Sequence, residues 1–220
     1  ASAAAMFQRL MHQLFHKMEH VIFFQDDILV MGKEKEEHNE RVNEVLRILQ
    51  EFGLTAEKSK CKFGQSKVTY LGHEISEKGI SPKPELVEAI LNSKVPQNKD
   101  EVISFLGLAE FYAKFVRNFS EKMYPIRQLL RKEVKFSWSE DCQRGFVSIK
   151  KDICSAPALQ GFDPSCKSII TTDASGKGLG AVLSQKEQDG RENVIAFASR
   201  ALTTTEERYS VIERETLACV

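Results

Sequence analysis

The first fifty residues alternate between helical spacing of hydrophobic positions and short continuous apolar runs. Phe7, Leu10, Met11, Leu14 and Met18 recur at helical intervals and predict a helix over residues 6–19. Two β-favouring runs, 21–24 and 28–31, then flank the polar residues 25–27 and predict a hairpin. Helical spacing returns over 39–52, where Gly53 ends it.

The middle of the chain is mainly helical in pattern. Residues 68–76 predict one strand, which Gly79 and Pro82 close. Hydrophobic positions then predict helices over 84–92, 102–116, 123–130 and 141–154.

The pattern changes after Ser165, where we place a domain boundary. Three strand-like runs, 168–172, 181–185 and 194–199, are separated by glycine-rich and polar turns. A last helix is expected to begin near Thr204 or Thr205 and to run to the chain end, capped by Thr205 with Arg208 or by Thr204 with Glu207.

Composition excludes several classes of protein. The 220 residues are 42% hydrophobic and 28% charged, which excludes a disordered or low-complexity chain. No apolar run reaches the ~20 residues of a membrane span, and no signal peptide opens the chain. Five scattered cysteines without a C-x-x-C motif argue against a disulfide framework, so a reducing, intracellular location is expected.

The net charge of zero conceals two segments of opposite sign. Residues 19–57 hold ten acids and four bases, whereas residues 110–151 hold ten bases and five acids. This segregation suits a carboxylate-rich site beside a polyanion-binding surface. Two helical faces solvated by opposite charges would give the same count.

Asp26 and Asp27 are the first candidates for chemistry. Adjacent aspartates between apolar runs are the ordinary composition of a solvated turn. The alternative is a magnesium site, because hard divalent cations take carboxylate oxygens and a pair of such ions can drive phosphoryl transfer. The spacing alone leaves both interpretations open.

A second pair of acids lies after residue 165. Asp173 ends the first predicted strand of that region, and Glu215 lies in the last predicted helix. The residues at i±3 and i±4 from Glu215 are all apolar (Val211, Ile212, Ala218 and Cys219), which places Glu215 on the inward side of the helix. An acid there is unusual unless it is paired or binds metal.

These segments together resemble the reverse transcriptase and ribonuclease H region of gypsy-type LTR retrotransposon polyproteins. The resemblance covers essentially the whole chain, in the family's order. It is carried by these motifs: Phe7-Gln8-Arg9-Leu10-Met11, Phe24-Gln25-Asp26-Asp27-Ile28-Leu29-Val30, Tyr70-Leu71-Gly72-His73-Glu74-Ile75-Ser76, Ser104-Phe105-Leu106-Gly107-Leu108-Ala109, Asn118-Phe119-Ser120, Thr172-Asp173-Ala174-Ser175 and Glu213-x-Glu215-x-Leu217-Ala218.

The resemblance implies an α+β fold in which a partial polymerase palm and thumb precede a truncated ribonuclease H-like α/β domain. It implies a palm over 1–95, a thumb and connection over 96–165, and the ribonuclease H-like part over 166–220. Asp26 and Asp27 would be two of three polymerase carboxylates, and Asp173 and Glu215 two of four nuclease carboxylates. Primer and nucleic-acid contacts would come from Phe24, Gln25, Leu71, Gly72, His73, Lys114 and Arg117.

The cofactors and partners implied are those of the family. Two Mg²⁺ ions, or Mn²⁺ in their place, would act at each site. The partners would be an RNA template, a DNA primer, RNA–DNA hybrid and dNTPs, without a membrane. The remaining carboxylates would lie outside these residues, so this chain is expected to be inactive alone. Phe24 stands where the family has tyrosine. A degenerate or co-opted remnant that only binds nucleic acid or a partner is the alternative.

Overall fold

The computed structural model describes residues 2–220 and divides into two compact units, Ala1–Tyr70 and Leu71–Val220. Each unit has its own hydrophobic core and is described by itself. The predicted domain limits of 1–95, 96–165 and 166–220 follow sequence motifs rather than contacts, and they stay a prediction.

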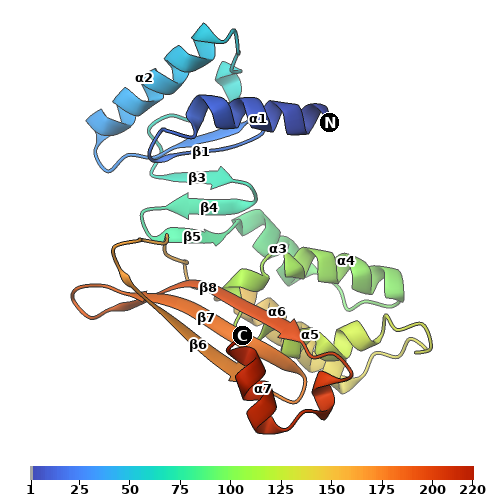
Figure 1. The fold of residues 1–220 in the computed structure, drawn as a ribbon. Helices are drawn as coiled ribbons and strands as arrows, with labels where there is room; N and C mark the ends of the chain where they lie inside the picture. Colours follow the sequence, from blue (N-terminus) through green and yellow to red (C-terminus); the bar gives the residue numbers. More distant parts are fainter. Residues whose placement is uncertain (1) are drawn as a thin grey trace. The chain divides into compact units, whose positions relative to one another are not determined.

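The first unit packs two helices against a β-hairpin (Figure 1). Its elements are α1 (Ala3–Phe15), β1 (Val21–Phe24), β2 (Asp27–Val30), α2 (Lys35–Glu51), the 3-10 turn η1 (Lys58–Lys60) and β3 (Lys67–Tyr70). Its buried core consists of Met11 and Phe15 from α1, Val21 from β1 and Val45 from α2. The helical spacing of the sequence therefore corresponds to the faces that meet here.

The second unit joins a helical bundle to an antiparallel sheet. Its elements are β4 (His73–Ser76), β5 (Gly79–Pro82), α3 (Pro84–Asn92), α4 (Lys99–Glu110), η2 (Ala113–Phe115), α5 (Phe119–Gln128), α6 (Glu140–Cys154), β6 (Lys167–Ala174), β7 (Gly178–Lys186), β8 (Glu192–Ala201), η3 (Glu206–Arg208) and α7 (Val211–Ala218).

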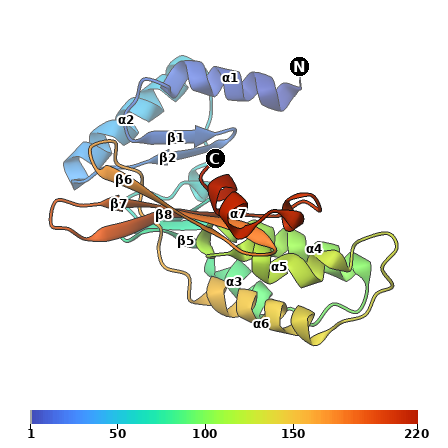
Figure 2. The same ribbon diagram turned by 60° about the horizontal axis from the view of Figure 1, so that its bottom comes forward.

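One large core holds this unit together. Buried side chains of α3, α4, η2, α5 and α6 form it together with Tyr112, which lies between α4 and η2; Tyr112, Met123 and Ile149 are fully enclosed. Helices α5 and α6 cross closely because Gly145 of α6 has no side chain. A Cβ at this position would collide with the backbone carbonyl of Lys122 in α5. The sheet, in the order β6-β7-β8, lies between α5 on one face and α7 on the other (Figures 1 and 2).

Most predicted elements are confirmed with shifted ends, and four predictions are wrong. Gly79 and Pro82 do not close the strand region, because residues 79–82 form a further strand, β5, which pairs with β4. The predicted strand 68–76 is two strands, because Leu71 and Gly72 both adopt positive φ and form a tight turn. The predicted helix 102–116 ends at Glu110 and is followed by a 3-10 turn. The last helix begins at Val211 rather than near residue 204, with Ser210 and Glu213 as its capping box.

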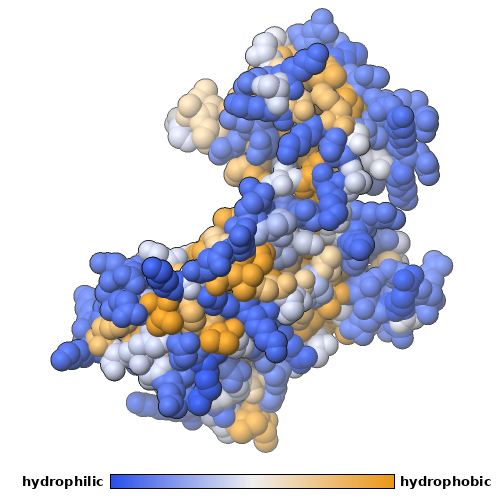
Figure 3. Space-filling model, turned by 180° about the vertical axis from the view of Figure 1, so that it is seen from behind, coloured by the Kyte–Doolittle hydropathy of each residue, from blue (hydrophilic) through white to orange (hydrophobic). Residues whose placement is uncertain are grey.

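Apolar side chains remain at the surface of both units, as the orange areas of Figure 3 show. Isolated ones are normal in soluble proteins. Two of them lie at tight turns: Phe24, 48% exposed, precedes the turn between β1 and β2, and Leu71, 42% exposed, is part of the turn between β3 and β4. Between residues 2 and 220, no helix combines the length and the apolar character that a bilayer span requires.

Candidate active sites and nucleic-acid interface

The first candidate site is the turn between β1 and β2. Phe24 pairs with Asp27, so Gln25 and Asp26 form a two-residue turn. Gln25 has a φ of 49°, which is uncommon for a residue with a side chain. Its backbone N–H donates to Oε1 of Gln8 at 2.6 Å, so α1 holds the turn from the side. Gln8 belongs to the Phe-Gln-Arg-Leu-Met motif, and its anchoring role was not predicted.

Asp26 and Asp27 present their carboxylates from this turn. Both are exposed, and across residues 2–220 neither side chain makes a hydrogen bond or an ion pair. Two free carboxylates are the donor type that Mg²⁺ and Mn²⁺ prefer. Within the same range no third His, Cys, Asp or Glu joins them in a group that could hold a metal. The two carboxylates are therefore suitable ligands for a hard cation, but by themselves they form an incomplete ligand set.

Tyr70, the last residue of β3, lies within electrostatic reach of Asp27. Its hydroxyl is buried and has no hydrogen-bond partner in the described part of the chain. Burial raises the pKa of Tyr70, and the negative charge of Asp27 raises it further. The phenol therefore stays protonated beside the carboxylate pair.

The second candidate site is the turn of Leu71, Gly72 and His73. Leu71 has a φ of 46° and Gly72 a φ of 76°, the pattern of a type I′ turn. Leucine rarely adopts this conformation, and strained residues of this kind cluster at functional sites. Nδ1 of His73 donates to the Leu71 carbonyl at 2.8 Å. The turn is thus fixed internally and leaves Leu71 at its tip.

His73 is enclosed by aromatic rings. It stacks on Phe111 with ring centroids 5.0 Å apart, and it also contacts Tyr112 and Phe115. Burial lowers the pKa of His73, and the positive charge of Lys114 lowers it further, against a small opposing effect of the Leu71 carbonyl. The imidazole is therefore held neutral, and its Nε2 is buried without a partner between residues 2 and 220.

Lys114 and Arg117 were predicted together as phosphate contacts, but their surroundings differ. Arg117 is exposed. Lys114 is half-buried, with Nζ 5.3 Å from the centroid of the Phe115 ring, and burial lowers its pKa. Arg117 is thus the freer of the two to follow a phosphate backbone.

Asp173 lies near the end of β6, opposite Gly180 of β7. It is exposed and lines a small polar recess with Asn118, Glu121 and Ser175. The preceding Thr172 contacts the thiol of Cys219, which follows α7, at 3.4 Å. Because side chains alternate along a strand, Asp173 points to the opposite face of the sheet from Thr172.

The prediction that Glu215 faces inward is wrong. Glu215 is exposed, as are Val211 at 62% and Ile212 at 79%. The half-buried residues of α7 are Arg214, Leu217 and Ala218, which lie on a neighbouring stripe of the helix. Within the described residues no hydrogen bond or ion pair joins Glu215 to Asp173. The apolar neighbours of Glu215 thus did not indicate burial.

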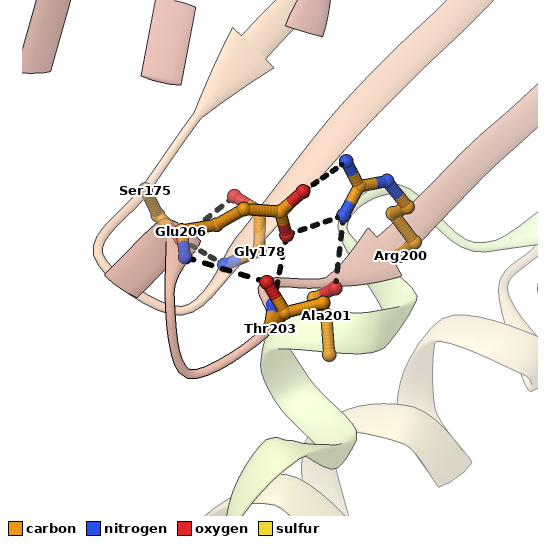
Figure 4. A network of polar contacts seen from close by, with 6 residues as sticks. All are labelled: Ser175, Gly178, Arg200, Ala201, Thr203 and Glu206. Carbon is orange, nitrogen blue, oxygen red and sulfur yellow. Dashed lines mark hydrogen bonds and ion pairs between the residues drawn. The ribbon is translucent and has the colours of Figure 1, made fainter. Parts of the chain in front are cut away.

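A network that sequence reasoning missed fixes the segment before α7 (Figure 4). Arg200 of β8 donates to both carboxylate oxygens of Glu206 at 2.8 and 2.9 Å. The Thr203 N–H donates to Glu206 at 2.8 Å, and the Glu206 N–H donates to the Thr203 hydroxyl. These bonds lower the pKa of Glu206 to about 2, with the bond from Arg200 as the largest cause. The Thr-x-x-Glu spacing was the available signal.

Ser175 and Gly178, also drawn in Figure 4, close the turn between β6 and β7. The Ser175 N–H donates to the Gly178 carbonyl at 2.9 Å, and the Gly178 N–H donates to the Ser175 hydroxyl at 3.1 Å. Farther along, the Tyr124 hydroxyl of α5 donates to Glu207 at 2.8 Å. The end of β6 and the segment leading to α7 are therefore held by side-chain bonds.

Comparison with known proteins identifies two families along the chain. Residues 1–75 match the family described as reverse transcriptase (RNA-dependent DNA polymerase). Residues 138–220 match the RNase H-like domain found in reverse transcriptase. The two matched ranges contain both candidate turns and both acid pairs.

Curated relatives cover the chain end to end. The Transposon Tf2-3 polyprotein of Schizosaccharomyces pombe is 35% identical over all of this chain, which spans 17% of that polyprotein. The Transposon Tf2-7 polyprotein of the same yeast is 36% identical over 93% of this chain and is covered over 15% of its own length. This chain thus spans about a sixth of the relatives that it matches.

Solved structures agree with the fold. A foamy viral protease-reverse transcriptase dRH in complex with double-stranded DNA has a TM-score of 0.85 at 26% identity, over 98% of this chain and 38% of that one. A foamy viral protease-reverse transcriptase in complex with RNA/DNA hybrid has a TM-score of 0.86 at 25% identity, over 100% of this chain and 30% of that one. These matches bear out the predicted α+β class.

Proposed function

Because this chain belongs to the reverse transcriptase and RNase H-like region of LTR-retrotransposon polyproteins, we propose that it supplies catalytic residues for RNA-directed DNA synthesis and for cleavage of RNA in an RNA–DNA hybrid. The observation that carries the proposal is the β1–β2 turn. It presents two adjacent and exposed carboxylates, Asp26 and Asp27, which have no partner between residues 2 and 220, from a strained backbone that Gln8 anchors.

Asp26 and Asp27 would hold Mg²⁺, or Mn²⁺, through their carboxylate oxygens. A pair of such ions supplies activation of a primer hydroxyl and stabilisation of the departing phosphate oxygen of a dNTP. The chain's own contribution is to present both carboxylates at the turn without an ion pair to any residue between 2 and 220. Phe24, half-exposed and paired with Asp27, and Gln25 would border the incoming primer and nucleotide.

Leu71, Gly72 and His73 would brace the primer terminus. Support comes from the strained tip at Leu71 and from the bond between His73 and the Leu71 carbonyl. Arg117, and to a smaller extent Lys114, would contact phosphates, so the affinity for template and primer should fall steeply with salt.

Asp173 and Glu215 would serve the ribonuclease H reaction. This assignment rests on the resemblance of their motifs and on both carboxylates being exposed. Between residues 2 and 220, no hydrogen bond or ion pair links these two side chains. We also propose that the 220-residue chain alone is inactive in both reactions, because residues 2–220 contain no group of three acidic, His or Cys ligands.

The test is extension of a DNA primer on an RNA template with Mg²⁺ or Mn²⁺. It compares this chain with the longer polyprotein product that contains it, each as wild type, Asp26→Asn and Asp100→Asn. Asp100 is a matched control, because it is an exposed aspartate in the first turn of α4. We expect extension by the longer wild-type protein and by its Asp100→Asn variant, and loss of extension in Asp26→Asn.

Undiminished extension by Asp26→Asn would refute the site. An inactive longer protein that still binds RNA in a salt-sensitive way would favour the second candidate, a remnant that only holds nucleic acid. The half-exposed Phe24, which brings no hydroxyl to Asp27, is the observation that favours that candidate.

A further inference from the structure

The turn of Leu71, Gly72 and His73 is attached to the segment that follows helix α4. The Tyr112 hydroxyl donates to the Gly72 carbonyl at 3.0 Å, across 40 residues of sequence. Tyr112 itself is completely buried, so its ring cannot move without disturbing the core. The backbone of the turn is therefore bonded to one of the most deeply buried side chains of the second unit.

Phe111 holds the same turn from another side. A Cβ placed on Gly72 would lie 2.8 Å from the far end of the Phe111 ring, a separation that Cβ atoms essentially never show, so the ring or the turn would have to shift. The same ring stacks on His73 at an interplanar angle of 26° and meets Tyr112 edge-on. The adjacent residues Phe111 and Tyr112 thus contact both Gly72 and His73. The side chain of Leu71, by contrast, is exposed to solvent.

Packing alone does not account for this arrangement. Leu71 keeps a φ of 46°, a conformation that costs leucine free energy, although its side chain is 42% exposed and gains little from burial. A strained backbone persists only where its surroundings determine it. Here the bond from His73 to the Leu71 carbonyl acts within the turn, and the hydrogen bond from Tyr112 and the ring of Phe111 hold it from outside.

We propose that Tyr112 and Phe111 are positioning residues for polymerisation: they fix the backbone of Leu71, Gly72 and His73 so that the tip of the turn is presented to the primer terminus in one conformation. This inference rests on the proposed polymerase function and deepens it. Neither aromatic residue needs to touch the reacting atoms. The turn and both aromatic residues lie in the unit Leu71–Val220, so the second unit determines the shape of the tip.

The test uses Tyr112→Phe, which removes only the hydroxyl, with Tyr124→Phe as its matched control. Tyr124 also donates one side-chain hydrogen bond in the same unit, to Glu207, away from the turn. Amide hydrogen exchange of residues 71–73 is measured on the 220-residue chain. Steady-state primer extension, corrected for the fraction of folded enzyme, is measured on the longer protein.

For Tyr112→Phe we expect exchange at the turn to accelerate by about three- to tenfold and kcat to fall by a similar factor, the size of one lost hydrogen bond. The Kd for primer–template should stay unchanged, because the basic side chains are intact. Tyr124→Phe should change neither quantity at the turn. A purely structural role would lower the folded fraction but leave kcat per folded enzyme as it was.

A double variant gives an independent test. Gly72→Ala should reduce kcat strongly, both through its clash with Phe111 and through the φ of 76° at Gly72, and combining it with Phe111→Ala should restore only the part due to the clash. Turn exchange in Tyr112→Phe equal to wild type would overturn the inference. So would an unchanged kcat in an active enzyme. An inactive longer wild-type protein would instead overturn the proposed function, with the exchange result still deciding whether Tyr112 fixes the turn.

Discussion

Two helical glycines of the second unit should respond to alanine in opposite directions. Gly145 in α6 is buried against the backbone of α5, whereas Gly107 in α4 is exposed and has no atom within 4 Å of an added Cβ. Replacing each by alanine adds the same methyl group to the same type of element. The sign of the stability change is therefore decided by the surroundings alone.

The magnitudes follow from the geometry. Alanine is preferred to glycine in a helix by ~1 kcal/mol, which is the whole effect expected for Gly107→Ala. At Gly145 the new Cβ would lie 2.3 Å from the Lys122 carbonyl oxygen, about 1 Å inside ordinary contact. Overpacking costs ~1–3 kcal/mol, and a backbone atom that cannot rotate away places this case at the upper end. After the helix preference is subtracted, Gly145→Ala should lose ~2 kcal/mol.

The single tryptophan makes the assay selective. Trp138 packs edge-on against Phe146 of α6 and donates from Nε1 to Gln143 at 2.9 Å, so its fluorescence reports the unfolding of this unit. Equilibrium urea unfolding would give the free energy for both variants. A Gly145→Ala protein as stable as wild type would refute the close helix crossing. Equal destabilisation by Gly107→Ala would show that the glycine surroundings do not decide the sign.

Three further outcomes are expected. Because the pKa of Glu206 is lowered to about 2 from its usual 4.5, its bond to Arg200 should stabilise the fold fully above pH 4.5 and be lost as the pH falls toward 2. Acid unfolding should show this loss in wild type and not in Glu206→Gln. Folding lowers the pKa of His73, so as the pH falls the unfolded chain takes up this proton at a higher pH than the folded chain does. The free energy of unfolding should therefore decrease below about pH 6.5. An NMR titration midpoint for His73 at or above 6.5 would contradict this. Arg117→Ala should reduce the slope of log affinity for RNA against log salt concentration by ~1. Lys114→Ala should reduce this slope by less, because Lys114 is half-buried against Phe115. Equal slopes for the two variants in filter binding would contradict this difference.

Local patterns in the sequence predicted most of the regular structure. The hairpin around Gln25 and Asp26, the helix Pro84–Asn92 and the three strands after Ser165 all appear as expected. Each depends on periodicity and turn residues, which act over a few neighbouring positions. The order of the motifs along the chain was equally informative about the family, because several motifs in the family's order are more specific than any single motif.

The sequence by itself therefore indicated candidate residues for chemistry and predicted most of the segments that become helix or strand. Only the tertiary structure decided their surroundings. Nothing near Leu71 and Gly72 in sequence shows that Tyr112 bonds to the turn, since the partners are 40 residues apart. Apolar neighbours suggested that Glu215 faces inward, yet α7 buries a different stripe. The physical reason is common to both: periodicity describes one element, whereas contact, burial and backbone strain depend on the element that packs against it.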